Sequence, residues 1–216
     1  MNTAQKIGII GSGGVAQTLA LGFLKHGHAV MLGTRDPAKL GVFVAAHPQV
    51  QVGSAAEAAA FSDMAVLAVK GSAAVEAVRS VAAQLAGKTV IDTTNPIADA
   101  APVNGVLSYF TGPNDSLLER LQSACPQVKF VKAFNSVGAP GMVNPSWAGG
   151  PPTMFIAGDD AAAKLAVSHV LTQFGWESAD MGSSTSGRAI EPLCMLWCIP
   201  GMLNNQWSHA FKLLRA

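Results

Sequence analysis

Apolar residues along the chain fall into short runs that alternate with stretches of helical periodicity. The run at residues 7–10 is short and β-branched and is followed at once by glycine, as is typical of a buried strand. From residue 14 to residue 25, the side chains of Val15, Leu19 and Phe23 recur at helical spacing. A strand, a turn and a helix therefore follow one another within the first 25 residues.

The same alternation continues along the rest of the chain, with glycine or polar turns between the elements. It predicts an α/β fold with a doubly wound, mainly parallel sheet of about eight strands and right-handed crossovers. The expected strands are 7–10, 29–32, 50–52, 64–69, 89–92, 128–133, 153–157 and 176–179. The expected helices are 14–25, 37–47, 54–61, 73–85, 115–124, 159–174 and 187–214, the last broken near Pro200.

The turn between the first strand and the first helix carries the pattern G-x-G-x-x-A, which in this setting is the fingerprint of a Rossmann-type dinucleotide site. Gly11 permits the tight turn, Gly13 lets a pyrophosphate approach the backbone, and Ala16 allows close packing of helix on strand. The alternative is a small-residue turn of an ordinary α/β protein. A second apolar strand follows at the spacing of a dinucleotide-binding fold and disfavours that alternative. The residues expected to hold the pyrophosphate are Gly11, Ser12, Gly13, Gly14 and Val15.

The end of the second strand indicates which dinucleotide is bound. An NAD site ends this strand with a carboxylate for the ribose 2′-hydroxyl, but here Thr34 and Arg35 follow glycine. A hydroxyl and a guanidinium would hold a 2′-phosphate, which favours NADP(H). Asp36 precedes Pro37 and is interpreted as the N-cap of the next helix. The alternative for Arg35 is a solvated surface side chain.

Further candidate residues follow the fourth, fifth and sixth strands. Ligands of such sheets bind beyond the carboxyl ends of the strands, where Val69, Lys70, Asn95 and Asn135 lie. We expect them to surround the nicotinamide end of the cofactor, with Lys70 near phosphate or ribose. The alternative for both asparagines is a turn residue satisfied locally.

No side chain is assigned to catalysis or to a metal. The five histidines fall at helix ends or within helices, and a flat ring acceptor of hydride requires no acid from the protein. We therefore expect an NADPH-dependent oxidoreductase that acts on a ring acceptor. Two alternatives stay open: a non-catalytic NADPH-binding sensor, and a reductase of a small carbonyl or imine, which would need a proton donor.

The later part of the chain bears on domain organisation and on oligomeric state. We expect residues 1–150 to form the NADP-binding domain and residues 151–216 to extend its sheet as part of one compact unit. Residues 138–152, rich in Gly and Pro, are either an acceptor-binding lid or a structural Ω-loop. The final helix, with Leu196 and Trp197, is more apolar than a covering helix needs. It is expected to form a homodimer interface, or else to pack wholly on its own sheet.

Composition narrows the class of partner. Half of the chain is apolar, 12% is charged and the net charge is +1, which points away from nucleic acid and anionic membranes. The apolar run 193–203 is too short to cross a bilayer, and the first strand begins before a signal peptide could fit. The three cysteines are expected to be buried thiols, as in a cytoplasmic protein.

Five segments of the chain form a distinctive combination: Ile7–Gly13, Gly33–Arg35, Ile91–Pro96, Lys132–Asn135 and Arg188–Leu193. Together they resemble the NADPH-dependent coenzyme F420 (deazaflavin) reductases, and more broadly the related dinucleotide-binding oxidoreductases. The resemblance covers nearly the whole chain and implies that Thr34 and Arg35 hold the 2′-phosphate. It also implies a dimer, with a deazaflavin or flavin co-substrate lying across the nicotinamide. Similar archaeal proteins carry a histidine after the sixth strand, where this chain has Asn135.

Overall fold

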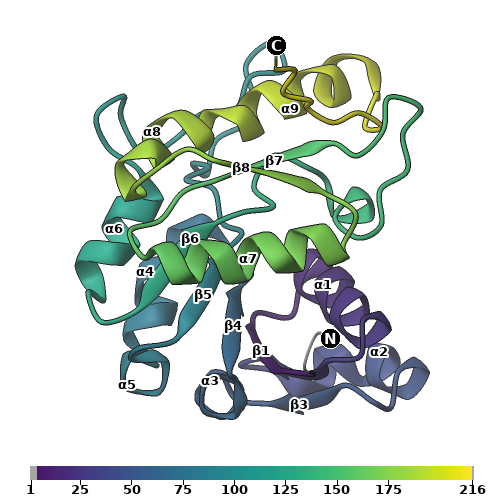
Figure 1. Ribbon diagram of the computed structural model, residues 1–216, viewed down its shortest axis with the longest axis vertical. Coiled ribbons are helices and arrows are strands. Elements are labelled where there is room, and N and C mark those ends of the chain that lie inside the picture. The colour runs from purple at the N-terminus through teal and green to yellow at the C-terminus, as the bar shows by residue number, and fades with distance from the viewer. Residues whose placement is uncertain (1–3, 216) are drawn as a thin grey trace.

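Six parallel strands form the main sheet of the computed structural model, which describes residues 4–215 (Figure 1). Their order is β3-β2-β1-β4-β5-β6, so the winding direction reverses between β1 and β4. This confirms the expected Rossmann-type α/β fold, and it places the ligand-binding crevice at the reversal. The strands are β1 (Lys6–Ile10), β2 (Ala29–Gly33), β3 (Gln51–Gly53), β4 (Met64–Leu67), β5 (Thr89–Asp92) and β6 (Lys129–Lys132).

Helices cover both faces of this sheet, which explains why its strands are apolar without alternation. Val66, Ile91 and Val131 face a core built with α1 (Gly14–Lys25) and α7 (Ala161–Gln173). The intervening strand residues pack into a second core on the opposite face. The helices that contribute to that second core are α3 (Ala55–Phe61), α4 (Gly71–Arg79), α5 (Ala82–Leu85) and α6 (Leu117–Ala124).

Several helix boundaries differ from expectation. The expected helix 37–47 is a 3₁₀ turn, η1 (Pro37–Leu40), followed by α2 (Gly41–Ala46). The expected helix 73–85 is two helices, α4 and α5, and β4 ends at Leu67 instead of residue 69. None of the helices in residues 4–215 is both long enough and apolar enough to cross a bilayer.

The last two strands do not extend the main sheet. β7 (Thr153–Ile156) and β8 (Glu177–Asp180) form a separate parallel pair, so the expected sheet of about eight strands is six plus two. The chain returns from β6 through the loop 138–152, not a helical crossover, and so approaches β6 antiparallel. Only one bridge forms, where the Lys132 amide donates to the Ala157 carbonyl at 2.9 Å. A Cβ at the next residue, Gly158, would lie 2.4 Å from the Phe130 carbonyl oxygen, so the backbones are already in close contact there.

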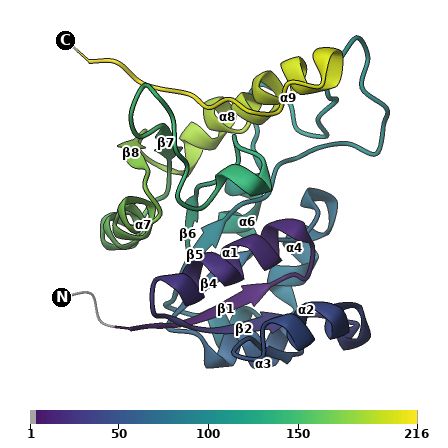
Figure 2. The ribbon, with the colours of Figure 1, turned by 90° about the vertical axis from the view of Figure 1, so that its right-hand side faces the viewer.

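The C-terminal helix is shorter than expected. After α8 (Gly187–Ile190), α9 (Pro192–Asn204) ends where Asn205 adopts left-handed backbone angles, with φ at 52°. The chain then folds back, with the Trp207 ring packed on Gly201, and the expected helix to residue 214 is wrong. The remaining tail runs beside β7, where the Thr153 amide donates to the Phe211 carbonyl (Figure 2).

Candidate cofactor site

The turn between β1 and α1 leaves a helix N-terminus open. Gly11 has φ at +137°, and a Cβ there would lie 2.1 Å from the Ala68 carbonyl oxygen, so only glycine fits. Added Cβ atoms at Gly13 and Gly14 would meet nothing within 4 Å. No side chain caps α1 and its first turn holds no acidic residue. The first N–H groups and the positive end of the helix dipole are therefore available to an anion.

A cavity of about 330 Å³ lies in front of this helix start, at the point where the sheet reverses. Six of the predicted site residues are on its wall. The neighbouring ends of β4 and β5 approach so closely that a Cβ at Gly71 would lie 1.9 Å from the Asn95 carbonyl oxygen. The lining residues are Gly13, Gly14, Val15, Ala68, Val69, Lys70, Gly71, Thr93, Thr94, Asn95 and Ile97.

Lys70 stands at the mouth of this cavity and forms an ion pair with Asp99. Both side chains are largely exposed, so solvent screens the charges and the ion pair contributes little stabilising free energy. The ammonium group can exchange this partner for a phosphate. Its predicted place near phosphate or ribose stays a prediction.

Hydroxyl and guanidinium groups gather at the end of β2. The Thr34 Oγ1 atom lies 3.2 Å from the Ser12 Oγ atom and accepts from the Asp36 amide at 3.1 Å. Within residues 4–215, the exposed Arg35 guanidinium has no hydrogen bond or ion pair. Asp36 occupies the N-cap position of η1 but makes no side-chain cap. Its carboxylate turns to Lys39 at 3.7 Å and leaves the Thr34–Arg35 side free for a 2′-phosphate.

Asn95 and Asn135 are joined to each other instead of being satisfied locally. Asn95 Nδ2 donates to the Asn135 carbonyl at 2.9 Å, and Asn135 Nδ2 donates to the Ile190 carbonyl at 3.0 Å. Asn95 reaches the cavity, whereas Asn135 is buried behind it. The Asn135 Oδ1 atom is buried without a hydrogen-bond partner. Their contact with the nicotinamide stays a prediction, and the geometry makes Asn135 a support for Asn95.

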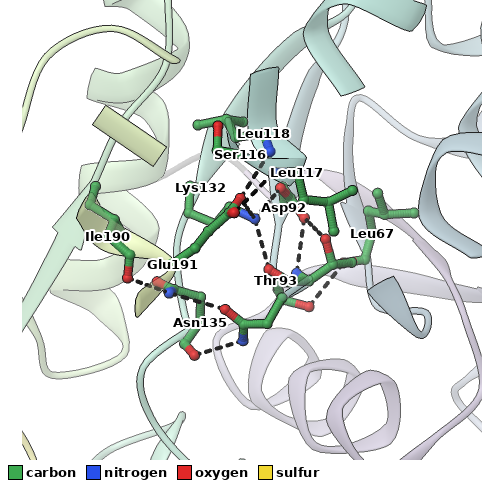
Figure 3. A network of polar contacts seen from close by, with 12 residues as sticks. Leu67, Asp92, Thr93, Ser116, Leu117, Leu118, Lys132, Asn135, Ile190 and Glu191 are labelled. Carbon is green, nitrogen blue, oxygen red and sulfur yellow. Dashed lines mark hydrogen bonds and ion pairs between the residues drawn. The ribbon is translucent and has the colours of Figure 1, made fainter. Parts of the chain in front are cut away.

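Behind the asparagines lies a buried charge cluster that the sequence analysis did not assign (Figure 3). The Lys132 Nζ atom is 2.6 Å from Asp92 Oδ2 and 3.0 Å from Glu191 Oε1, and it donates to the Thr94 carbonyl at 2.7 Å. All three charged side chains are fully buried. Burial alone would lower the pKa of Lys132, but the two carboxylates outweigh it and raise that pKa.

This cluster fixes four segments at the carboxyl end of the sheet. Asp92 Oδ1 accepts from the Thr94 amide and hydroxyl at 2.9 and 2.7 Å. Glu191 accepts from the Leu117 and Leu118 amides, both at 2.9 Å, and so caps α6 from another part of the chain. The turn before Asn95 is thereby tied to α6 and to the start of α9. The sequence does contain an indication of this cluster, because a lysine and an aspartate within apolar strands need buried partners.

The chain is similar to a known protein family and to a solved structure. Residues 6–96 match the family described as NADP oxidoreductase, coenzyme F420-dependent. A crystal structure of a candidate F420-dependent NADP reductase from Arthrobacter sp. FB24 is 32% identical with a TM-score of 0.92, covering 98% of this chain and 100% of that one.

Two other matches are partial. The chain is 32% identical over 211 residues to metalloreductase STEAP3 of Rattus norvegicus, covering 93% of this chain and 39% of that protein. It therefore spans about two fifths of the length of this curated relative. An imine reductase from Streptomyces aurantiacus shares the fold, with a TM-score of 0.66 at 17% identity over 92% of this chain and 63% of that one.

Proposed function

Because the chain belongs to the family of coenzyme F420-dependent NADP oxidoreductases, we propose that it transfers a hydride between NADPH and a flat ring acceptor such as coenzyme F420 or a flavin. The observation that carries the proposal is the uncapped start of α1 beside Thr34 and Arg35, open to a cavity at the sheet reversal. That arrangement suits a dinucleotide with a 2′-phosphate.

Each part of the site has a role in binding. The turn Gly11–Val15, with the free amides at the start of α1, holds the pyrophosphate, and Thr34 and Arg35 hold the 2′-phosphate. When bound, NADPH supplies a hydride, which is two electrons and a proton, to the acceptor ring and becomes NADP⁺. The ring takes a second proton from solvent. The protein positions the two rings and keeps water away from them.

The composition of the cavity wall favours a ring acceptor. Among its described lining residues, Lys70 is the one ionisable side chain, and it is paired with Asp99. A carbonyl or imine substrate requires a placed proton donor, whereas a flavin or deazaflavin ring spreads the charge itself. The three cysteines are unpaired thiols, which suits a cytoplasmic location as part of this proposal.

A second candidate function follows from the likeness to the rat metalloreductase over 93% of this chain. In that case the final acceptor of the electrons of NADPH is a metal ion, of which iron is the one tested below. The non-catalytic NADPH sensor is the third candidate.

The test is NADPH oxidation by the purified protein, followed by the loss of nicotinamide absorbance, with a panel of acceptors. The panel contains coenzyme F420, FMN, a ferric chelate with and without FMN, and a pyrroline carboxylate. Turnover with F420 or FMN alone supports the ring acceptor. Turnover that needs iron as well supports the second candidate. Tight NADPH binding with no turnover on any acceptor contradicts both and leaves the sensor.

A further inference from the structure

The cluster of Lys132, Asp92 and Glu191 places three charged side chains where apolar side chains would fill the same space (Figure 3). Removing charges from water is costly, and well-packed apolar residues in place of a buried ion pair are often at least as stabilising. Stability alone therefore does not explain the cluster. Its hydrogen bonds have defined lengths and angles, so the groups that it bonds are held in fixed directions.

One route from the cluster to the cofactor cavity runs through the backbone of Thr94. The Lys132 Nζ atom donates to the Thr94 carbonyl at 2.7 Å, and Asp92 Oδ1 accepts from the Thr94 amide at 2.9 Å and from its hydroxyl at 2.7 Å. The cluster thus bonds the carbonyl, the amide and the hydroxyl of this one residue. The next residue, Asn95, lies on the cavity wall, so the cluster sets the position of its backbone.

A second route runs through side-chain amides. Glu191 directly follows Ile190, whose carbonyl accepts from Asn135 Nδ2 at 3.0 Å. The Asn135 carbonyl accepts from Asn95 Nδ2 at 2.9 Å, and Asn135 Nδ2 also lies 3.3 Å from Asn95 Oδ1. Glu191 itself is fixed by Lys132 and by two amides at the start of α6. The two routes therefore converge on Asn95, one on its backbone and the other on its side chain.

We propose that Lys132 and Glu191 are positioning residues for the nicotinamide end of NADPH, which they hold in register through Thr94 and Asn95 without touching it. The inference rests on the proposed function, in which the nicotinamide lies beside Asn95. Neither Lys132 nor Glu191 lines the cavity. A wall that is bonded from behind has little freedom to lose when the ring binds, and such preorganisation strengthens binding.

The arrangement separates the two ends of the cofactor. The phosphates are expected at the start of α1 and at the end of β2. None of the described side-chain bonds of Lys132, Asp92 or Glu191 reaches either segment. A looser cluster should therefore weaken the binding of the nicotinamide ring and leave the binding of the phosphates unchanged. A general loss of folded structure would weaken both.

The test is calorimetric titration of the whole protein with NADPH and with 2′-phospho-ADP-ribose, which has a hydroxyl in place of the nicotinamide ring. In Glu191→Gln, which keeps the size of the side chain, NADPH should bind about three- to tenfold more weakly and 2′-phospho-ADP-ribose should change by less than about twofold. Lys132→Met also removes the hydrogen bond to the Thr94 carbonyl and should show the same pattern more strongly.

Arg188→Met is the matched control. The Arg188 guanidinium makes three hydrogen bonds to the Glu119 carboxylate and so ties the same late segment of the chain to α6. None of its described bonds reaches Thr94 or Asn95. The ratio of the two dissociation constants in Arg188→Met should therefore stay within about twofold of the wild-type ratio.

Each outcome decides between positioning and a structural role. A wild-type ratio of the two dissociation constants in Glu191→Gln, or an equal loss for both ligands, overturns the proposal. So does a wild-type protein that binds NADPH no more tightly than 2′-phospho-ADP-ribose. Glu191→Gln keeps the Lys132–Asp92 pair and should stay folded, so it decides alone if Lys132→Met does not fold.

The titrations do not depend on turnover. If no acceptor oxidises NADPH but Glu191→Gln weakens NADPH alone, the proposed hydride transfer fails and the positioning of the nicotinamide end is supported. If turnover occurs and the ratio is unchanged, the proposed function stands and the positioning role fails.

Discussion

Arg35 is the residue on which we expect the choice between NADPH and NADH to depend. Its guanidinium is exposed and unpaired within the described chain, beside the Thr34 hydroxyl. Arg35→Ala should weaken NADPH binding by about 1.5–3 kcal/mol, the scale of a charge-assisted hydrogen bond, and leave NADH almost unchanged. Titration of each cofactor by calorimetry measures this. An equal loss for the two cofactors would show that Arg35 does not contact the 2′-phosphate.

Lys132 is the residue whose replacement we expect to lower the free energy of unfolding most. Lys132→Met leaves Asp92 and Glu191 buried without their cation, at a cost of about 3–5 kcal/mol in the free energy of unfolding. The matched control is Lys70→Met, which breaks the exposed pair with Asp99 and should cost less than about 1 kcal/mol. Urea denaturation of both variants gives the comparison. Similar values for the two would mean that the buried pair contributes no more than the surface pair.

The sequence predicts the positions of those candidate residues that directly follow a strand. Gly11, Gly13 and Thr34 follow strands in a fixed order, so their place at the carboxyl edge could be predicted from pattern alone. The mutual bonding of Asn95 and Asn135 and the burial of Glu191 could not, because each depends on a partner 40 or more residues away. Long-range partners leave no periodic signal in one sequence.

At the scale of elements, three helices have an acidic side chain at the N-cap or in the first turn. Glu57 caps α3 together with Ser54, Glu119 at the start of α6 bonds Arg188, and Asp160 caps α7. The pKa of each carboxyl is lowered. The backbone hydrogen bond at the cap is the main cause for Glu57 and Asp160, and the Arg188 hydrogen bond for Glu119. These helix starts therefore depend on ionised carboxylates.

The sign of the pH dependence follows. A carboxyl with a lowered pKa in the folded state contributes stability above its unfolded value, here 4.5 for Glu119, and loses it as the pH falls through the folded value. Glu119→Gln should therefore make stability fall less steeply below pH 4.5. Glu76→Gln, an exposed change on α4 without a described ion pair, is the control. Thermal melts across this range decide it, and parallel slopes for Glu119→Gln and wild type would contradict the expectation.

Sequence patterns predict a helix or strand correctly where its hydrophobic periodicity alone determines it. They fail where the element depends on the segments that pack against it. The strands of the main sheet are apolar runs buried on both faces, and sequence patterns identify such runs well. The same kind of run at β7 does not reveal that it would pair with β8 alone. Likewise, the apolar pattern after Asn204 indicates a helix, but the left-handed Asn205 and the contact of Trp207 with Gly201 end it.

At the scale of the molecule, α9 carries an exposed apolar face that we expect to join a second copy of the chain. Leu196 and Leu203 are 54% and 56% exposed on this helix, and Leu203 contacts Gly105, which lies between the exposed Val103 and Val106. Leu203→Glu should convert a dimer to a monomer in analytical ultracentrifugation. The control is Leu165→Glu, which changes a side chain 60% exposed on α7. A monomeric wild-type protein at micromolar concentration would exclude this interface.

The buried cluster also has a consequence for how the chain is made. During synthesis, Lys132 and Asp92 leave the ribosome well before Glu191, the carboxylate that completes their environment and caps α6. Until then the Lys132 ammonium has one carboxylate partner instead of two, and the Leu117 and Leu118 amides lack their acceptor. We therefore expect the nascent chain to become fully resistant to protease only after residue 191 has left the ribosome. A fragment ending at residue 150 lacks Glu191 and should be cleaved faster by protease than the whole chain.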